Sequence, residues 1–447
     1  MGESKIVIIG GGVAGLVAAC RLARAGKRVT VLEKAERFGG RAITVTKNGA
    51  LLNLGSHAFY RGGEAERIFR ELGLRLAGGS PSIAISVLWD GRVMPLARFI
   101  MGRPFTWAGR IELARALLKL MRPDPAAEDI SDASLRAWIE RHLREPMGRN
   151  LLYAMLRTST FTHAPDRQCA GPALKQARRT LKPGAVVYLE GGWQSIVDQL
   201  VGIALREGAE LVRSAGVEAV MHEDGRVRGV RLKDGSELEA EAVIAAVPPA
   251  EACRLVRSAE QTSLRVWKEQ ARPVTVACLD LCLRRLPAPR NRIVMGIDEP
   301  VFFSYQSGPT PSLAKEGHVV HAVRYHGIGE HDPAGDEAAL EQAMDVIQPG
   351  WRDEMIARQY LPAMTAAYDY PHAGRADRAP GPAVPEVRGL YVAGEWTGRG
   401  ELLVDAAAAS GERAAEKLLD DLRTVGDRPH HGTEAGRCAS AENFFSQ

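Results

Sequence analysis

Apolar and polar residues follow one another in distinct blocks at the start of the chain. The run KIVIIG (5–10) is apolar apart from its first residue, as in a strand buried on both faces. The alanine-rich stretch VAACRLARAG (17–26) has helical composition and ends at a glycine. KRVTVLEK (27–34) is rich in β-branched residues and predicts a second strand. Together these blocks predict a βαβ unit of about 30 residues.

Later blocks predict further elements of an α/β protein. GGWQSIVDQLVGIALREGAEL (191–211) predicts a helix that leads into a strand. Alternating apolar and polar residues then surround Asp-Gly turns at 224–225 and 234–235, which predicts a meander of hairpins. AVIAAVPP (242–249) predicts a buried strand that ends at the prolines, and 389–419 predicts a strand, a glycine-containing loop and a long helix.

Three glycines give the first βαβ unit a candidate chemistry. Gly10, Gly12 and Gly15 form the pattern GxGxxG between the strand and the helix. Gly10 permits the tight turn, Gly12 lets the backbone approach a pyrophosphate, and Gly15 lets helix and strand pack closely. The helix N-terminus, with Val13 and Ala14, favours negative charge. The unit therefore predicts a dinucleotide site.

An acidic residue indicates which dinucleotide. Glu33 lies at the end of the second strand, followed by Lys34, where a carboxylate accepts hydrogen bonds from ribose hydroxyls. A 2′-phosphate would be repelled there, so NADP is disfavoured. NAD and FAD remain.

The stretch FGGRA (38–42) distinguishes the two. It resembles the motif that follows the βαβ unit in the superfamily of flavin-containing amine oxidases, phytoene desaturases and protoporphyrinogen oxidases. The resemblance implies FAD, with the loop at Gly39, Gly40 and Arg41 against the diphosphate. Taken alone, these residues are also compatible with a simple glycine turn and a solvated arginine.

The C-terminal segment 389–419 resembles the second flavin motif of the same superfamily. By position, Gly394 and Glu395 are implied to lie at the ribityl or diphosphate region. Val404 and Asp405 begin a helix whose N-terminus is implied to face the flavin pyrimidine. A helix N-terminus would stabilise the negative charge of a reduced flavin. The alternative is an ordinary amphipathic helix.

Two further segments complete the predicted site. GSHAF begins at Gly55 and continues with Ser56 and His57, where the superfamily lines the flavin face. His57 is the ionisable residue expected near the isoalloxazine, unless its ring is satisfied by local backbone. The strand at Val217 is implied to contact the adenine through its backbone.

The resemblance covers three separate segments and implies a fold. Residues 1–75, 190–262 and 385–424 are predicted to form a discontinuous Rossmann-like FAD-binding domain of α/β class. Residues 76–189 and 263–384 are predicted to form an inserted substrate domain of mixed sheet plus helices. Within it, ARPVTVACLDLCLRR (271–285) predicts a strand. The polar tail 425–447 is expected to be disordered.

Composition narrows the partners. The chain has 447 residues and a net charge of +4 from interspersed charges, which does not suggest a nucleic-acid partner. The cysteines are scattered and predict neither a metal site nor a disulfide framework, as in a reduced, cytoplasmic protein. They are Cys20, Cys169, Cys253, Cys278, Cys282 and Cys438. None lies between Cys282 and Cys438, so the cysteine that holds flavin covalently in the similar monoamine oxidases has no counterpart here. The resemblance therefore implies noncovalent FAD.

One amphipathic helix, predicted for 107–122, has two interpretations. Its apolar stripe could rest on an anionic membrane and admit a lipophilic substrate, or it could be core with solvated basic neighbours, which is more common. The stripe comprises Trp107, Ile111, Ala114, Leu118 and Met121, flanked by Arg115, Lys119 and Arg122.

These features favour an FAD-dependent oxidoreductase that takes a hydride from an apolar small molecule onto flavin N5, as a desaturase or dehydrogenase. The electron acceptor would be O2 or a quinone. An amine oxidase that forms an imine and hydrogen peroxide is the second hypothesis. A redox-neutral isomerase or mutase using reduced FAD, and a lipid-binding chaperone of the same fold, are the third and fourth.

Overall fold

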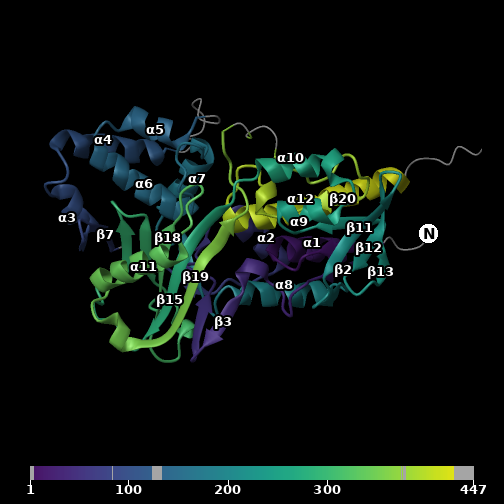
Figure 1. Ribbon diagram of the computed structural model, residues 1–447, viewed down its shortest axis with the longest axis horizontal. Helices are drawn as coiled ribbons and strands as arrows, with labels where there is room; N and C mark the ends of the chain where they lie inside the picture. The colour runs from purple at the N-terminus through teal and green to yellow at the C-terminus, as the bar shows by residue number, and fades with distance from the viewer. Residues whose placement is uncertain (1–4, 83, 123–132, 374, 376–378, 427–447) are drawn as a thin grey trace, which may run out of the picture.

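The computed structural model describes residues 5–82, 84–122, 133–373, 375 and 379–426. The tail predicted for 425–447 lies outside this range, apart from the last two residues of helix α12. Figure 1 shows an elongated molecule, with a parallel-sheet region at one end and a second sheet covered by a helical cluster at the other.

The first βαβ unit is present as predicted. Strand β1 (Lys5–Ile9) leads into helix α1 (Val13–Arg24), and strand β2 (Arg28–Leu32) returns parallel to β1. The helix begins at Val13, four residues before the predicted stretch 17–26, because the glycine pattern forms its first turn. Gly12 is its N-cap.

The parallel sheet takes its strands from distant parts of the chain. Its order is β10-β2-β1-β14-β20, with every pair parallel. The added strands are β10 (Glu210–Val212), β14 (Ala242–Ala245) and β20 (Leu390–Val392). Helices α1, α8 (Gln194–Arg206) and α12 (Leu403–Gly426) pack together. This arrangement confirms the Rossmann-like α/β class, while the exact domain boundaries stay predictions.

The predicted meander is also present. Strands β11 (Val217–Glu223), β12 (Arg226–Leu232) and β13 (Glu237–Glu239) form an antiparallel sheet, and its turns hold the two Asp-Gly pairs. It packs with helix α9 (Pro249–Leu255) over the parallel sheet. Helix α10 (Ser263–Gln270) follows α9.

A mixed sheet of seven strands forms the other part of the molecule, in the order β19-β15-β18-β17-β16-β7-β8. The predicted strand at 271–285 is its β15. One face packs on a cluster of helices within residues 107–180, and the other packs on helix α11 (Pro333–Ile347). The strands are β7 (Ile85–Trp89), β8 (Arg92–Pro95), β15 (Val274–Leu283), β16 (Ile293–Gly296), β17 (Val301–Tyr305), β18 (His318–Tyr325) and β19 (Met355–Ala367).

The remaining elements connect these two parts or cover them. The helices are α2 (Glu64–Leu72), α3 (Leu96–Met101), α4 (Trp107–Leu120), α5 (Leu135–His142), α6 (Pro146–Thr160) and α7 (Ala170–Thr180). The short strands are β3 (Thr44–Lys47), β4 (Ala50–Asn53), β5 (Phe59–Tyr60), β6 (Gly78–Gly79) and β9 (Val186–Leu189).

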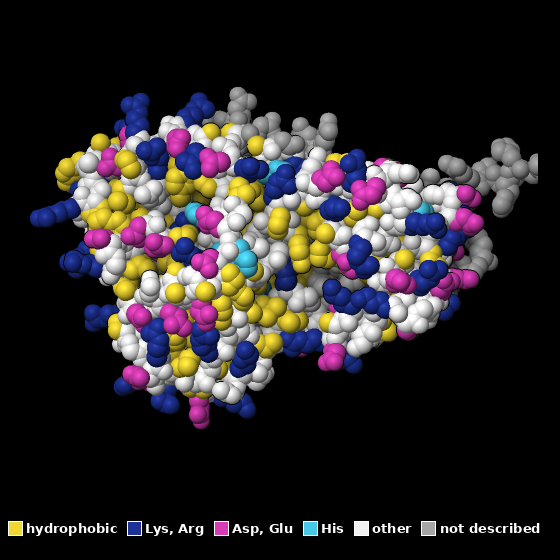
Figure 2. Space-filling model, in the orientation of Figure 1, with side chains coloured by type: hydrophobic (Ala, Val, Ile, Leu, Met, Phe, Trp, Pro, Cys, Tyr) yellow, Lys and Arg dark blue, Asp and Glu magenta, His cyan; other side chains and the backbone are white. Residues whose placement is uncertain are grey.

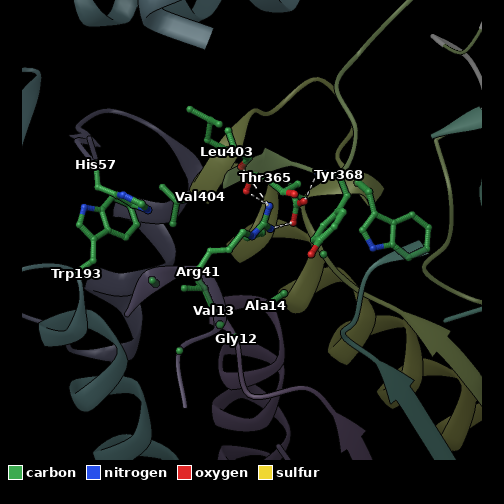
Figure 3. Close-up of a pocket in the computed structure, with 18 of the residues that line it drawn as sticks. Gly12, Val13, Ala14, Arg41, His57, Trp193, Thr365, Tyr368, Leu403 and Val404 are labelled. Carbon is green, nitrogen blue, oxygen red and sulfur yellow. Dashed lines mark hydrogen bonds and ion pairs between the residues drawn. The ribbon is translucent and has the colours of Figure 1, made fainter. Parts of the chain in front are cut away.

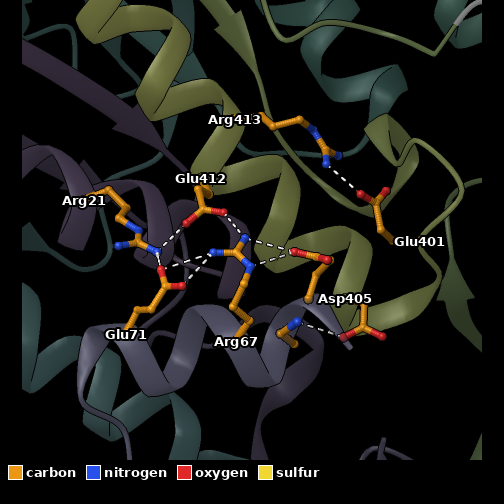
Figure 4. A network of polar contacts seen from close by, with 9 residues as sticks. Arg21, Arg67, Glu71, Glu401, Asp405, Glu412 and Arg413 are labelled. Atoms are coloured by element: carbon orange, nitrogen blue, oxygen red, sulfur yellow. Dashed lines mark hydrogen bonds and ion pairs between the residues drawn. The ribbon is translucent and has the colours of Figure 1, made fainter. Parts of the chain in front are cut away.

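A network of charged side chains ties the C-terminal helix to the N-terminal unit (Figure 4). Glu412 of α12 forms ion pairs with Arg21 of α1 and Arg67 of α2. Glu71 of α2 bridges the same arginines, at 2.6 Å from Arg21 and 3.0 Å from Arg67. Asp405 accepts a hydrogen bond of 2.8 Å from the backbone of Ala65 at the start of α2. These contacts hold the start of α12 beside α2.

Helix α4 does not bury the apolar stripe predicted for it, although burial in the core was the more common interpretation of such a stripe. It buries the face formed by Gly109, Leu113, Ala116 and Leu120. The predicted apolar stripe faces outward, with Trp107 at 73% and Leu118 at 70% exposed. The interpretation of the stripe as core is therefore wrong. The packing of small and aliphatic residues against α6 and α3 selects the other face.

Candidate functional site

A cavity of about 360 Å³ runs from the glycine loop of α1 to the large mixed sheet. Its wall combines segments from both ends of the chain and from strand β19 (Figure 3). Most of the residues predicted from the sequence line it. They are Gly10, Gly12, Val13, Ala14, Glu33, Gly39, Gly40, Arg41, Ser56, His57, Gly394, Glu395 and Val404.

The glycines of the first loop have different physical roles. Gly10 has a φ of +105°, and a Cβ there would lie 2.5 Å from the Ala246 carbonyl oxygen. A Cβ on Gly15 would lie 2.0 Å from the Gly10 carbonyl oxygen, so α1 can pack on the turn only without a side chain. Gly12 has no atom within 4 Å of a Cβ position and opens onto the cavity. Its backbone is therefore accessible to a bound group, as the motif predicts.

Glu33 closes one end of the cavity and is 8% exposed. Its Oε2 accepts from the Gly11 amide at 2.8 Å, and its Oε1 accepts from the Ala35 amide at 2.9 Å. The carboxylate thus holds the glycine loop against the end of β2. Each carboxylate oxygen has a second lone pair, so Glu33 can still accept from a ligand hydroxyl.

Arg41 lies at the middle of the cavity (Figure 3). Gly39, two residues before Arg41, has a φ of +127°, and its amide donates a 2.8 Å hydrogen bond to the Gly11 carbonyl. The second glycine loop therefore lies against the first. The Arg41 guanidinium pairs with Glu395 at 2.5 Å and lies 4.7 Å from the Tyr368 ring centre. Burial alone would lower the pKa of Arg41, but the Glu395 carboxylate outweighs burial and raises it. Arg41 is therefore a permanent cation inside the cavity.

The start of α12 forms the wall beyond Arg41. Leu403, Val404 and Ala407 line the cavity, while Glu395 also accepts a 2.7 Å bond from the Tyr368 amide. Asp405 does not line this cavity. It pairs with Arg179 in a neighbouring cavity of about 180 Å³, and burial raises its pKa. Leu403 and Val404 at the helix start, rather than Asp405, face the site.

His57 lies at the opposite wall, beside Trp193 (Figure 3). The two rings meet edge to face with centres 5.1 Å apart, and Nδ1 lies 3.1 Å from the Gly55 carbonyl oxygen. Burial lowers the pKa of His57 to about 4, so the ring is neutral near pH 7. Beneath this segment, the Gly55 amide donates to buried Asp280 at 3.1 Å. The histidine is thus held by its own backbone, as the alternative interpretation expected, and still faces the cavity.

Four predicted residues do not line the cavity: Gly15 and Gly55 lie behind it, Lys34 is exposed, and Val217 is buried in the meander. Their assignment as cofactor contacts stays a prediction. Several residues that line the cavity were not predicted from the sequence, among them Phe161, Trp193, Met364, Ala366, Tyr368 and Leu403. For Trp193, the two preceding glycines were a sequence signal that could have indicated a position near the site. The residues of β19 and the segment after it gave no signal, because they reach the site only through the packing of the two sheets.

The cavity places opposite charges in a definite order. Glu33 offers acceptors at one end, the N-terminus of α1 and Arg41 offer positive charge in the middle, and the N-terminus of α12 offers it further on. This order suits a ribose, a diphosphate and an electron-accepting ring. The fold and the cavity are compatible with an oxidoreductase that uses a nucleotide cofactor.

Comparison with known proteins gives the family. The family model described as flavin containing amine oxidoreductase matches residues 13–419, and the chain belongs to this family of flavoproteins. It is similar to a zeta-carotene-forming phytoene desaturase of Myxococcus xanthus, with 26% identity over 54% of this chain and 52% of the relative. A coproporphyrinogen III oxidase of Propionibacterium freudenreichii is 26% identical over 56% of this chain and 58% of the relative. The chain thus spans about half the length of these relatives.

A solved structure agrees on the fold. An oxidoreductase from Methanosarcina mazei superposes with a TM-score of 0.75 at 19% identity, covering 92% of this chain and 100% of the other. The matches confirm the predicted superfamily and the flavoprotein class.

Proposed function

We propose that the protein binds FAD noncovalently and transfers a hydride from an apolar organic substrate to flavin N5, as a desaturase or dehydrogenase. The supporting observation is the order of groups along one cavity, from Glu33 through Arg41 to the start of α12. When bound, the flavin supplies the electron-accepting ring. The chain supplies the binding groups, the orientation and the exclusion of water.

Each charged group has a role that follows from its surroundings. Glu33 holds the ribose hydroxyls, and Arg41 with the N-terminal amides of α1 holds the diphosphate. The Arg41 guanidinium must then contact both Glu395 and the diphosphate. This is possible because the ion pair between Arg41 and Glu395 lines the cavity. The N-terminus of α12 stabilises negative charge on the ring that receives the hydride.

The far end of the cavity indicates the substrate class. Phe161, Trp193, Met364 and Leu403 contribute apolar surface there, and His57 is uncharged near pH 7. An apolar substrate has little hydration free energy to lose when it binds against these apolar side chains. A cationic substrate would lose its hydration and find no buried carboxylate among these residues to replace it. This composition favours carbon–hydrogen oxidation of an apolar molecule over amine oxidation.

An amine oxidase is the second candidate, because the matching family model is described as flavin containing amine oxidoreductase. A neutral amine could bind beside neutral His57. The lipid-binding chaperone is weaker, since Glu33, Arg41 and the two glycine loops all line the cavity. A redox-neutral isomerase that uses reduced FAD needs the same binding groups and is the third candidate. O2 or a quinone is proposed as electron acceptor.

The test begins with the absorption spectrum of the purified protein. We expect flavin bands that acid precipitation releases into the supernatant as FAD. Anaerobic addition of polyunsaturated or partly saturated hydrocarbons should bleach the bands, and primary or secondary amines should not. Bleaching by amines alone would replace the first candidate with the second. A colourless protein that FAD does not reconstitute would refute both.

We also propose that the outer face of α3 and α4 rests on an anionic membrane, in a protein of the cytoplasm. Apolar and basic side chains lie next to each other on this face, at the upper left of the molecule in Figure 2. Such a surface binds at the lipid interface through buried apolar area and attraction to anionic headgroups. Within the described chain, no helix combines the length and hydropathy needed to cross a bilayer. The exposed residues are Arg98, Met101, Arg103, Trp107, Ile111, Arg115, Leu118, Met121 and Arg122.

Vesicle sedimentation tests this contact. Replacing Arg115, Lys119 and Arg122 with Ser should weaken binding to anionic vesicles, and salt should do the same to the wild type. A matched triple change of exposed arginines on the meander, at Arg226, Arg228 and Arg231, should have no such effect. Equal sedimentation of both variants and the wild type would refute the membrane contact.

A further inference from the structure

Three metal-ligand side chains converge at the C-terminal end of β18, an interior strand of the seven-stranded sheet, in a place with no part in the proposed flavin site. His326 directly follows β18, Asp336 lies in the first turns of α11, and His331 lies in the connection between them. One ligand atom from each of the three lies within 4.8 Å of the others. The cysteine positions predicted no metal site, but this cluster contains no cysteine.

The two buried members face each other without a hydrogen bond. His326 and Asp336 are both 6% exposed. Nε2 of His326 lies 2.9 Å from Oδ2 of Asp336. The approach lacks hydrogen-bond geometry, and neither atom has another hydrogen-bond partner among the described residues. Buried polar atoms are normally paired, so two of them directed at one point indicate an absent partner that both can bind. A cation meets that requirement.

The other atom of each buried ligand is already held in place. Nδ1 of His326 lies 3.0 Å from the Thr275 hydroxyl, and Oδ1 of Asp336 accepts from Nε of Arg324 at 3.0 Å. These bonds orient the ring and the carboxylate and leave Nε2 and Oδ2 available. Metal-binding histidines and carboxylates are commonly oriented in this way by outer partners.

The spacing is also compatible with a small metal ion. Ligand atoms on a tetrahedral zinc ion, each about 2.0–2.2 Å from the metal, lie roughly 3.3–3.5 Å apart. His326 and Asp336 need to separate by only a few tenths of an ångström. His331 is exposed on a connection with glycines at 327 and 329, the latter with a φ of +75°, so its ring can complete the set.

The charged side chains near the cluster include both signs. The positive charge of Arg324 lies beside Asp336 and by itself would repel a bound cation. Its guanidinium also pairs with Glu299 at 3.1 Å, so its charge is shared between two carboxylates. Glu330, four residues after His326, adds a further negative charge to the connection.

We propose that His326, His331 and Asp336 bind a divalent transition metal ion of the zinc class. Two imidazoles and one carboxylate suit zinc, whereas magnesium and calcium prefer oxygen ligands alone. The ion would join the end of β18 to the start of α11 and leave one coordination position for water. Tyr325, beside His326, packs on Phe161 of the flavin cavity with ring centres 5.8 Å apart. The ion would therefore stabilise the cavity wall, whether or not the flavin proposal is correct.

Calorimetry with zinc chloride tests the site. The full-length protein, without an affinity tag, is dialysed against EDTA and then titrated in the presence of a competing chelator. We expect one equivalent of Zn²⁺ to bind and to raise the Tm. His331→Ala removes an exposed ligand and should weaken this binding by at least about 100-fold, beyond the effect of losing an outer partner. Its Tm in EDTA should match the wild type.

His222→Ala is the matched control, since it removes another solvent-accessible histidine on the meander. It should bind Zn²⁺ as the wild type does. Cobalt chloride should give the wild type absorption bands beyond those of the flavin, which His331→Ala should lack. The proposal is overturned if the wild type shows no equimolar site, or if His331→Ala and the wild type bind Zn²⁺ equally.

Discussion

Replacing Glu33 with alanine is the sharpest test of the proposed FAD site, because this carboxylate has two separable tasks. In the free protein its oxygens accept from the amides of Gly11 and Ala35 at 2.8 and 2.9 Å. In the complex the same carboxylate is proposed to accept from ribose hydroxyls. The substitution therefore affects both the conformation of the loop and the affinity for FAD.

The magnitudes follow from the contacts. A hydrogen bond to a charged group contributes about 1.5–3 kcal/mol. Loss of the ribose contact should weaken FAD binding by about 10- to 100-fold. Loss of the two amide contacts should lower the free energy of unfolding of the free protein by about 2–4 kcal/mol, since water reaches the vacated space and offsets part of the loss.

Two measurements separate the tasks. Fluorescence titration of the free protein with FAD gives the affinity, and denaturant unfolding of the same sample gives the stability. Glu36→Ala is the matched control, because it removes an exposed carboxylate three residues away and should change neither quantity. Turnover per bound flavin should stay near the wild-type value, since the ribose lies away from the reacting ring. Full FAD affinity in Glu33→Ala would show that Glu33 is not the ribose ligand.

Four further substitutions test other parts of the cavity. Gly12→Val should abolish FAD binding yet leave the Tm of the free protein nearly unchanged, because a Cβ at this position has no atom within 4 Å. Gly15→Val should prevent folding, since a Cβ there lies 2.0 Å from a carbonyl oxygen. A large loss of stability in Gly12→Val, seen by calorimetry, would contradict this contrast. Arg41→Ala should weaken FAD binding by about 10-fold or more and lower the free energy of unfolding by about 1–3 kcal/mol, because buried Glu395 loses its cation; unchanged FAD titration would exclude Arg41 from the diphosphate. His57→Gln should flatten the pH dependence of the free energy of unfolding in the free protein. Burial holds the His57 pKa at about 4, so the stability that depends on neutral His57 is complete above the ordinary pKa of 6.5. That stability falls by up to about 3 kcal/mol as pH drops from 6.5 to 4. Identical pH profiles of unfolding for the variant and the wild type would refute that assignment.

Local pattern was sufficient for the βαβ unit and the meander. Strand periodicity, Asp-Gly turns and the glycines at 10, 12 and 15 act over a few residues, so their consequences can be predicted without the rest of the chain. Glu33 was recognisable for the same reason, because its distance from the glycine loop follows from one helix and one strand. The identity of the second glycine loop and of the C-terminal segment required resemblance to a family.

Contacts between distant segments were decided only by the tertiary structure. Arg41 and Glu395 are 354 positions apart, and their ion pair exists because β14 and β20 join the same parallel sheet as β1. Tyr368 and Met364 reach the cavity through the packing of β19 and the segment after it. Such contacts depend on how sheets associate, and residue spacing along one strand carries no information about its partner.

Helix α4 shows the same division within a single element. Its sequence contains two sets of apolar or small residues at helical spacing, and either set could have formed the buried face. The structure buries Gly109 and Leu113 and exposes Trp107 and Leu118. The close approach of α6 requires small residues at the contact, which the bulky tryptophan face cannot offer. The sequence by itself determines that the helix is amphipathic, and the shape of its neighbours determines which face meets solvent.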